Sequence, residues 1–104
     1  MKANTVLITG ASRGIGKATA EAFAQQGYQV LINFNKSEQE AVALYDSLKK
    51  KECSVKLFKA DVSKRNEVEA MINFCVNEFG RIDVLVNNAG ISQEKLFVDI
   101  TDED

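Results

Sequence analysis

The stretch TVLITGASRGIG, residues 5–16, decides the fold of this chain. Its first five residues form a short apolar run that predicts a buried strand, and the residues from 14 to 26 predict a helix. Three glycines join the two elements. Gly10 permits a tight turn, Gly14 lets the backbone approach a pyrophosphate group, and Gly16 lets the helix pack closely on the strand. The positive end of the helix dipole would then face the phosphates.

Outward from this stretch, strands and helices alternate along the chain. Further strands are predicted over residues 29–34, 55–60 and 83–87, with helices over residues 38–51 and 64–79 between them. The order βαβαβαβ predicts a parallel sheet with right-handed crossovers and helices on both faces. We therefore expect an α/β fold: the N-terminal part of a Rossmann-type, doubly wound parallel sheet with strand order 3-2-1-4.

The apolar pattern also predicts which helix faces are buried. In the first helix the expected buried residues are Ile15, Ala18, Ala22 and Phe23. In the third helix they are Val68, Met71, Ile72, Cys75, Val76 and Phe79. Ser37 and Glu40 fit a capping box at the start of the second helix. Thr101 and Asp104 resemble the first turn of one more helix, so we expect the chain to be cut from a longer protein.

Composition excludes several classes of function. The chain has 104 residues and a formal net charge of −2, so it has no basic field and we expect no nucleic-acid partner. No apolar run approaches the roughly 18 residues of a membrane span, and there is no signal peptide. The absence of histidine, with no CxxC motif, excludes a zinc site and histidine-based catalysis, so we expect no metal. Two cysteines outside any CxxC motif, without an export signal, indicate a cytoplasmic protein.

The glycine loop also allows two other interpretations, a purely structural turn and the phosphate-binding loop of a P-loop NTPase. A purely structural turn would use glycine only to relieve backbone strain, which three glycines between a strand and a helix make the weaker interpretation. A P-loop NTPase would need a hydroxyl on Mg²⁺ where this chain has Ala18, and a first glycine where it has Ala11. Both observations disfavour the P-loop without removing it.

Three motifs together resemble the short-chain dehydrogenase/reductase family. They are TGASRGIG at residues 9–16, Asp61-Val62 after the third strand, and Asn87-Asn88-Ala89-Gly90 after the fourth. Within the family the chain is most similar to 3-oxoacyl-[acyl-carrier-protein] reductases, and its last part also resembles reductases of the 5-aminopentanone modification of elongation factor P. The resemblance implies reversible hydride transfer between a nicotinamide cofactor and a carbonyl/alcohol pair.

The resemblance also implies which residues bind the cofactor. At the pyrophosphate and its ribose it implies the loop residues Gly10, Ser12, Arg13, Gly14, Ile15 and Gly16. At the adenine edge it implies the Asp61 side chain and the Val62 backbone. Beside the adenosine ribose and the nicotinamide approach it implies Asn88, Ala89 and Gly90. A structural role remains open for Asp61, as a cap at the end of its strand, and for Asn87, as a brace of the sheet.

The end of the second predicted strand favours NADP(H) over NAD(H). An NAD enzyme usually has an acidic residue there, which binds the ribose 2′-hydroxyl, but this chain has Phe34. Asn35, Lys36 and Ser37 follow, and Arg13 lies in the glycine loop, so two cations and a hydroxyl suit a 2′-phosphate. Lys36 could instead be a solvated surface charge, and Ser37 could act only as a helix cap.

No catalytic residue can be named in this chain. The family uses a tyrosine, a lysine four residues later, a serine and an asparagine, and the resemblance places all of them beyond residue 104. Tyr45 and Lys49 have the tyrosine–lysine spacing by chance, because they lie on the second predicted helix. Residues 1–104 are thus expected to form the cofactor-binding part of a single Rossmann domain, inactive alone.

The whole protein is expected to be an NADP-dependent reductase of a ketone, small or bound to a carrier protein. It would form a homo-oligomer, a dimer or tetramer, without nucleic acid or membrane. A non-catalytic nucleotide-binding fragment is the first alternative, and the P-loop NTPase is the second. In the chain as it stands, residues 84–86 are expected to form an exposed, aggregation-prone edge.

Overall fold

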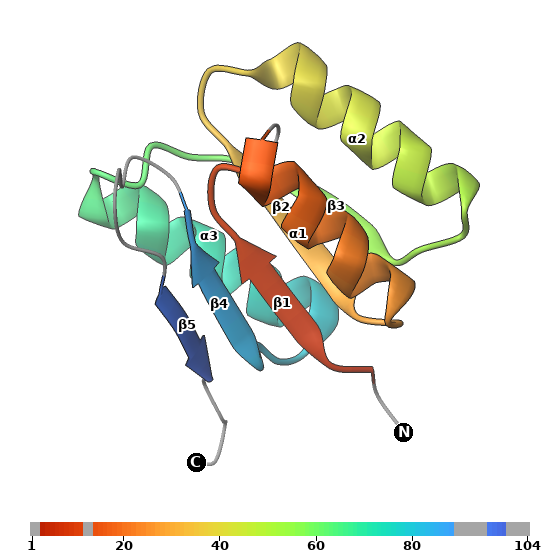
Figure 1. Ribbon diagram of the computed structural model, residues 1–104. Helices are drawn as coiled ribbons and strands as arrows, with labels where there is room; N and C mark the ends of the chain where they lie inside the picture. Colours follow the sequence, from red (N-terminus) through yellow and green to blue (C-terminus); the bar gives the residue numbers. More distant parts are fainter. Residues whose placement is uncertain (1–2, 12–13, 89–95, 100–104) are drawn as a thin grey trace.

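The structure, a computed structural model, describes residues 3–11, 14–88 and 96–99. Three helices and five strands follow one another in these ranges (Figure 1). Their bounds are β1 Thr5–Ile8, α1 Gly14–Gln25, β2 Gln29–Phe34, α2 Glu38–Lys50, β3 Val55–Lys59, α3 Arg65–Phe79, β4 Val84–Asn87 and β5 Leu96–Asp99. Each helix and each of the first four strands occurs where the sequence predicts it, within one or two residues.

The five strands form one sheet in the order β3-β2-β1-β4-β5. The first four are parallel and have the predicted order 3-2-1-4, so the predicted Rossmann-like α/β fold is confirmed. Alternate residues of the strands enter two cores. Ile8 and Ile32 pack under α1 and α2, whereas Leu7 and Leu31 pack under α3. The helices therefore cover both faces of the sheet, two on one side and one on the other (Figure 1).

The expectation of an exposed edge at residues 84–86 is wrong. β5 pairs antiparallel with β4, with Leu85 opposite Val98 and Val86 opposite Phe97. β4 is therefore an inner strand, and the two edges are β3 and β5. β5 is only four residues long, and the sequence predicts no helix between it and the strand at residues 83–87, so it lacks the strand–helix alternation by which the other strands were recognised.

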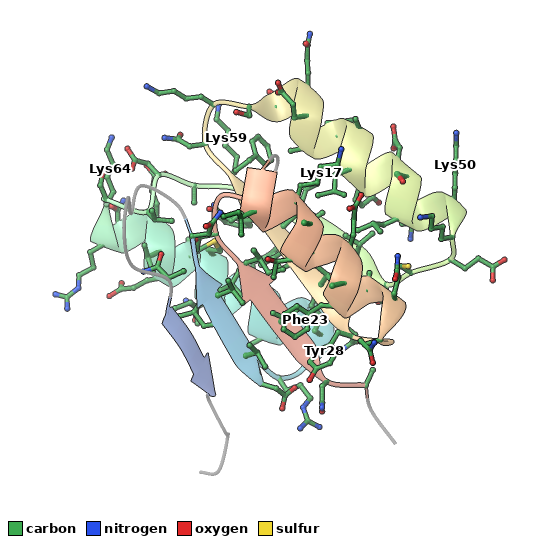
Figure 2. All side chains as sticks on the ribbon, in the orientation of Figure 1. Lys17, Phe23, Tyr28, Lys50, Lys59 and Lys64 are labelled. Carbon is green, nitrogen blue, oxygen red and sulfur yellow. The ribbon has the colours of Figure 1, made fainter. Side chains whose placement is uncertain are left out.

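The buried face of α1 also differs from the prediction. Ile15 is 60% exposed, and Ala18 and Ala22 are exposed as well. The buried residues are instead Gly16, Ala20 and Ala24, one side chain per turn and all small. Small residues let α1 lie close to the sheet, so packing distance rather than hydrophobicity selects this face. Phe23 is only half-buried and packs edge-on against Tyr28, with ring centroids 4.8 Å apart (Figure 2).

The predicted capping box at α2 is wrong. Ser37 is the N-cap residue, but its side chain makes no capping hydrogen bond, and its φ of −94° and ψ of 60° depart from the extended conformation usual at this position. The Ser37 carbonyl accepts a hydrogen bond from the Ala41 backbone N–H, and Glu38 and Glu40 in the first turn suit the helix dipole.

The apolar stripe of α3 is only partly buried. Met71, Cys75 and Phe79 are buried, and burial raises the pKa of the Cys75 thiol to about 12. Ile72 and Val76 remain 37% and 42% exposed. They border an apolar cavity of about 200 Å³, whose lining is Leu7, Ile72, Val76, Gly80, Arg81, Ile82 and Leu85. Gly80 ends the helix in the left-handed conformation, with φ 86°, as its sequence position predicts.

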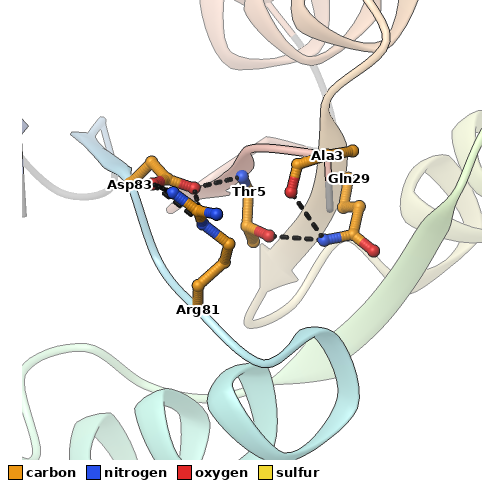
Figure 3. A network of polar contacts seen from close by, with 5 residues as sticks. All are labelled: Ala3, Thr5, Gln29, Arg81 and Asp83. Carbon is orange, nitrogen blue, oxygen red and sulfur yellow. Dashed lines mark hydrogen bonds and ion pairs between the residues drawn. The ribbon is translucent and has the colours of Figure 1, made fainter. Parts of the chain in front are cut away.

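A polar network joins β1, β2 and the start of β4 at the amino edge of the sheet (Figure 3). Asp83 Oδ2 accepts a hydrogen bond of 2.7 Å from the Thr5 backbone N–H, and Arg81 pairs with the same carboxylate at 2.7 Å. The Gln29 amide donates to the Thr5 hydroxyl at 2.7 Å. Partial burial raises the pKa of Asp83, but the hydrogen bonds and charge of Arg81 and the Thr5 N–H outweigh it, so the pKa lies below its ordinary value.

Among the described residues, no helix is both long and apolar enough to cross a membrane.

Candidate functional site

The glycine loop lies at the carboxyl edge of the sheet, between β1 and α1. Gly10 has φ 62° and Gly14 has φ 65°, both in the left-handed region that a residue with a side chain rarely adopts. A Cβ built on Gly14 would meet no atom within 4 Å, so its backbone faces open space. Both glycines therefore satisfy the turn, and the open space at Gly14 leaves its backbone approachable, as a bound phosphate would need.

Gly16 packs α1 directly onto this loop. A Cβ at this position would lie 2.3 Å from the Gly10 carbonyl oxygen and 2.8 Å from Ala11 Cα. Both are backbone atoms, which cannot move aside as the end of a flexible side chain can. The close packing expected from the third glycine is thus present, and it fixes where the N-terminus of α1 begins.

A buried amide that the sequence analysis did not single out also holds the loop. The Asn33 side chain, in β2, accepts a hydrogen bond of 3.2 Å from the Gly10 backbone N–H. Asn33 is 1% exposed. A polar residue within the apolar run QVLINF was the available signal, because a strand buried on both faces rarely carries an amide without a partner for it.

The Asn87-Asn88 pair connects β4 to the same loop. The Asn88 backbone N–H donates to the Thr9 hydroxyl at 2.7 Å, and the Asn88 side-chain amide lies 3.4 Å from the Gly10 carbonyl oxygen. The Thr9 hydroxyl lies 3.1 Å from Asn87 Oδ1. Asn87 therefore braces the ends of β1 and β4, which is the structural role left open for it, and Asn88 borders the glycine loop.

Asp61 and Val62 follow β3, at the same edge, and both are half-buried. Asp61 Oδ1 accepts hydrogen bonds from the Ser63 backbone N–H at 2.9 Å and the Ser63 hydroxyl at 2.7 Å. These bonds, with smaller contributions from the charges of Lys64 and Lys36, hold the pKa of Asp61 below its ordinary value. The carboxylate therefore does act as a cap after its strand, and it is ionised at neutral pH.

The end of β2 places an apolar residue and a cation next to each other. Phe34, the last residue of β2, is 6% exposed, whereas Asn35 and Lys36 are exposed and Ser37 is half-buried. The charge of Lys36 acts on Asp61, so the segments after β2 and β3 lie near one another. No acidic side chain occupies the last position of β2.

Some predicted residues lie outside the described part of the chain. These are Ser12, Arg13, Ala89 and Gly90, together with the helix turn expected at residues 101–104. Ile15 is described and lies exposed in the first turn of α1.

Tyr45 and Lys49 do not belong to this site. Tyr45 packs against the core beneath α2, and Lys49 Nζ lies 6.0 Å from the centroid of its ring. The pair is thus a helix packing contact, as expected. No cluster of three or more potential metal ligands occurs among the residues that the structure describes.

The fold and the loop together define a Rossmann-type α/β protein with a glycine loop at the carboxyl edge. The family model of the short chain dehydrogenases matches residues 4–104. The 3-oxoacyl-[acyl-carrier-protein] reductase FabG of Staphylococcus aureus is 40% identical over 100 residues, which are 96% of this chain and 41% of that protein. The 3-oxoacyl-[acyl-carrier-protein] reductase of Synechocystis sp. is 40% identical over 104 residues, 100% of this chain and 42% of that protein.

A solved structure agrees with these relatives. An actinorhodin polyketide ketoreductase crystallised with NADPH matches with a TM-score of 0.79 and 30% identity, over 88% of this chain and 36% of the other. The chain belongs to the short-chain dehydrogenase/reductase family, and the relatives named here are reductases. It spans about two fifths of the length of the curated relatives it matches.

Proposed function

We propose that this chain is the cofactor-binding part of an NADP-dependent reductase that converts a ketone into the hydroxy product. The glycine loop carries the proposal. Gly10, shortly after β1, and Gly14, the first residue of α1, adopt the left-handed conformation, and Gly16 packs α1 onto the loop. The first N–H groups of a helix have no partner within the helix, and its dipole is positive there, so this junction suits a pyrophosphate.

The residues around the loop fit the rest of a dinucleotide. The loop from Gly10 to Gly16, with Ser12 and Arg13 within it, would hold the pyrophosphate. Asp61 and the Val62 backbone would meet the adenine, and Asn88, followed by Ala89 and Gly90, would border the ribose and the approach to the nicotinamide. Asp61 keeps one carboxylate oxygen, Oδ2, outside its bonds to Ser63, so it can still accept a hydrogen bond from an adenine amino group.

The choice of NADP(H) rests on the segment after β2. Phe34 is buried and apolar, so no carboxylate is available there for a ribose 2′-hydroxyl or against a 2′-phosphate. Lys36 is exposed, and the Ser37 hydroxyl is not used in capping α2, so both side chains remain available to bind a phosphate. Asp61, Glu38 and Glu40 bring negative charge into the same region, so we expect the preference for NADPH to be moderate rather than absolute.

The reaction needs more than this chain provides. A bound nicotinamide supplies a hydride for the carbonyl carbon, and an acid must then give a proton to the carbonyl oxygen. Tyr45 packs under α2, and Tyr28 lies just before β2 at the amino edge, so neither tyrosine can serve at the carboxyl edge. We propose that the acid belongs to the remaining part of the whole protein, and that 3-oxoacyl thioesters on a carrier protein are its substrate class, in line with the relatives.

The test compares NADPH and NADH titrations of the 104-residue chain. NADPH is expected to bind more tightly, and Lys36→Ala to weaken NADPH binding roughly tenfold, because a charge-assisted hydrogen bond contributes about 1.5–3 kcal/mol. NADH binding should change little. Lys50→Ala is the matched control, because Lys50 is an exposed lysine at the far end of α2 (Figure 2). Equal affinities for both cofactors in the parent chain would contradict the preference.

Two further experiments distinguish the proposed reductase from a P-loop NTPase and from a non-catalytic nucleotide-binding protein. ATP with Mg²⁺ should not displace NADPH, and displacement would favour the P-loop NTPase. With a 3-oxoacyl thioester present, the chain alone is expected to oxidise NADPH no faster than buffer. A longer chain carrying the remainder of the reductase sequence should oxidise it, whereas a longer chain that binds NADPH without turnover would favour a non-catalytic nucleotide-binding protein.

A further inference from the structure

One buried side chain contacts three segments of the carboxyl edge at once. Asn33 Oδ1 accepts from the Gly10 backbone N–H at 3.2 Å. Asn33 Nδ2 lies 3.2 Å from the Ala60 carbonyl oxygen, 3.3 Å from that of Phe58 and 3.5 Å from that of Phe34. The partners fix the orientation of the amide, because a backbone N–H can only donate and a carbonyl oxygen can only accept.

These bonds connect the two halves of the candidate cofactor site. Gly10 begins the glycine loop after β1, and Ala60 immediately precedes Asp61 after β3. The backbone carbonyl of Asn33 also accepts from the Ala11 N–H at 3.1 Å, and the Ala60 N–H donates to the Phe34 carbonyl at 2.9 Å. The side chain of Asn33 thus lies between the segment expected at the phosphates and the segment expected at the adenine.

An apolar side chain would suffice for packing at this position. Leu31, two residues earlier in β2, lies in the core beneath α3 without any polar group to satisfy. An amide that is 1% exposed is favourable only if its hydrogen bonds are made, because an unpaired buried amide is strongly destabilising. A fully bonded amide at the end of a buried strand therefore specifies the position of its partners.

We infer that Asn33 is a positioning residue of the cofactor site: it sets the glycine loop relative to the Asp61 segment. The inference rests on the proposed cofactor function and adds a residue to it. Asn33 touches no phosphate or base itself in this role. It acts through Gly10 and Ala60, so its loss should weaken NADPH and NADH alike, in contrast to the loss of Lys36.

The decisive variant is Asn33→Leu, which keeps the number and branching of the side-chain heavy atoms and removes every polar contact of the side chain. Its dissociation constants for NADPH and NADH should both rise, roughly threefold to tenfold and by similar factors. Thr5→Val is the matched control, since Thr5 is also buried, at 0% exposure, and loses its hydrogen bond with Gln29 at the opposite edge. This control should unfold more easily but bind both cofactors as the parent does.

Amide hydrogen exchange gives a readout that does not need a cofactor. The Gly10 amide should exchange faster in Asn33→Leu, whereas the Ala11 amide, which donates to the Asn33 backbone, should stay protected. If Asn33→Leu does not fold, Asn33→Thr keeps one hydroxyl in a side chain that favours strands, and smaller changes in the same direction are expected.

The outcomes distinguish the two proposals. A parent chain that binds neither cofactor would remove the proposed function, and unchanged Gly10 exchange in the variant would by itself overturn the positioning role. A parent that binds NADPH, with an Asn33→Leu variant that binds it equally well, would keep the function and overturn the inference. A loss of NADPH binding without a loss of NADH binding would also overturn it, because a selective effect belongs to the 2′-phosphate contact.

Discussion

Gly27 and Gly16 are each required to be glycine, but for different physical reasons. At Gly27 the backbone requires it, since φ is 91° while the space around a Cβ is open. At Gly16 the conformation is helical and the space requires it, because a Cβ would overlap the Gly10 carbonyl and Ala11 Cα. Only Gly16 lies in the candidate site. Substituting alanine at each position in turn therefore distinguishes the effect of backbone strain from the effect of close packing.

We expect Gly16→Ala to lower the free energy of unfolding by about 1–3 kcal/mol through overpacking and to abolish measurable NADPH binding. Gly27→Ala should lower it by about 1–2 kcal/mol through left-handed strain, and leave binding intact. Urea unfolding and NADPH titration of both variants test this difference. Parent-like NADPH affinity in Gly16→Ala would show that the packing of α1 on the loop is not needed for the site.

At the scale of elements, side-chain hydrogen bonds join the amino ends of β1 and β4 in addition to the backbone hydrogen bonds between the two strands. Asp83 accepts from the Thr5 N–H, and its own N–H donates to the Thr5 carbonyl at 2.9 Å. The Arg81 guanidinium bonds both oxygens of the carboxylate, at 2.7 to 3.0 Å. This pairing starts β4 in register with β1, and it depends on the charge of Asp83.

We expect this charge to make part of the stability pH-dependent. The pKa of Asp83 is lower in the folded chain than in the unfolded chain. The ionised carboxylate therefore stabilises the fold fully above the pKa of the unfolded chain, near 3.9. This stabilisation is lost as the pH falls through the pKa of the folded chain. Asp83→Asn should therefore cost about 1.5–3 kcal/mol at pH 7. The difference in the free energy of unfolding between this variant and the parent should shrink below about pH 4.

Urea unfolding of the parent and the variant from pH 7 to pH 2.5 measures this difference. Asp46→Asn, at an exposed position of α2, serves as the control for removing a carboxylate outside this network. An Asp83→Asn difference that stays constant over the whole range would contradict the role of the charge.

At the scale of the whole molecule, the fifth strand decides which parts of the sheet meet solvent. β5 covers β4, leaving β3 as the opposite edge, where Lys56 and Lys59 are exposed. Lysines on an edge strand oppose pairing with another chain. β4 has the apolar sequence VLVN and would have no such protection if it were the edge.

We therefore expect a shortened chain of residues 1–95, which lacks β5, to associate at concentrations at which the 104-residue chain is monomeric. Size-exclusion chromatography with light scattering measures this, and hydrogen exchange of residues 84–87 should rise in the shortened chain. A shortened chain that stays monomeric, with unchanged protection of these amides, would show that β5 does not shield β4.

The sequence by itself determined the alternation of strands and helices, the parallel order 3-2-1-4 and the glycine loop. These features follow from local patterns: apolar runs of strand length, glycines at helix ends, and the resemblance carried by three short motifs. Asn87 as a brace and Asp61 as a strand-end cap were also open in the sequence, since their positions after strands allow such roles.

Only the tertiary structure decided which small residues of α1 face the sheet, because the distance between helix and sheet favours Gly16 and Ala20 over the larger Ile15. It also decided that Ser37 makes no side-chain cap and that residues 96–99 pair with β4. Asn33 belongs to the same group, since Gly10 on one side and Phe58 and Ala60 on the other are distant from it in the chain. Local patterns carry no information about such contacts, because their energy arises only when distant segments meet.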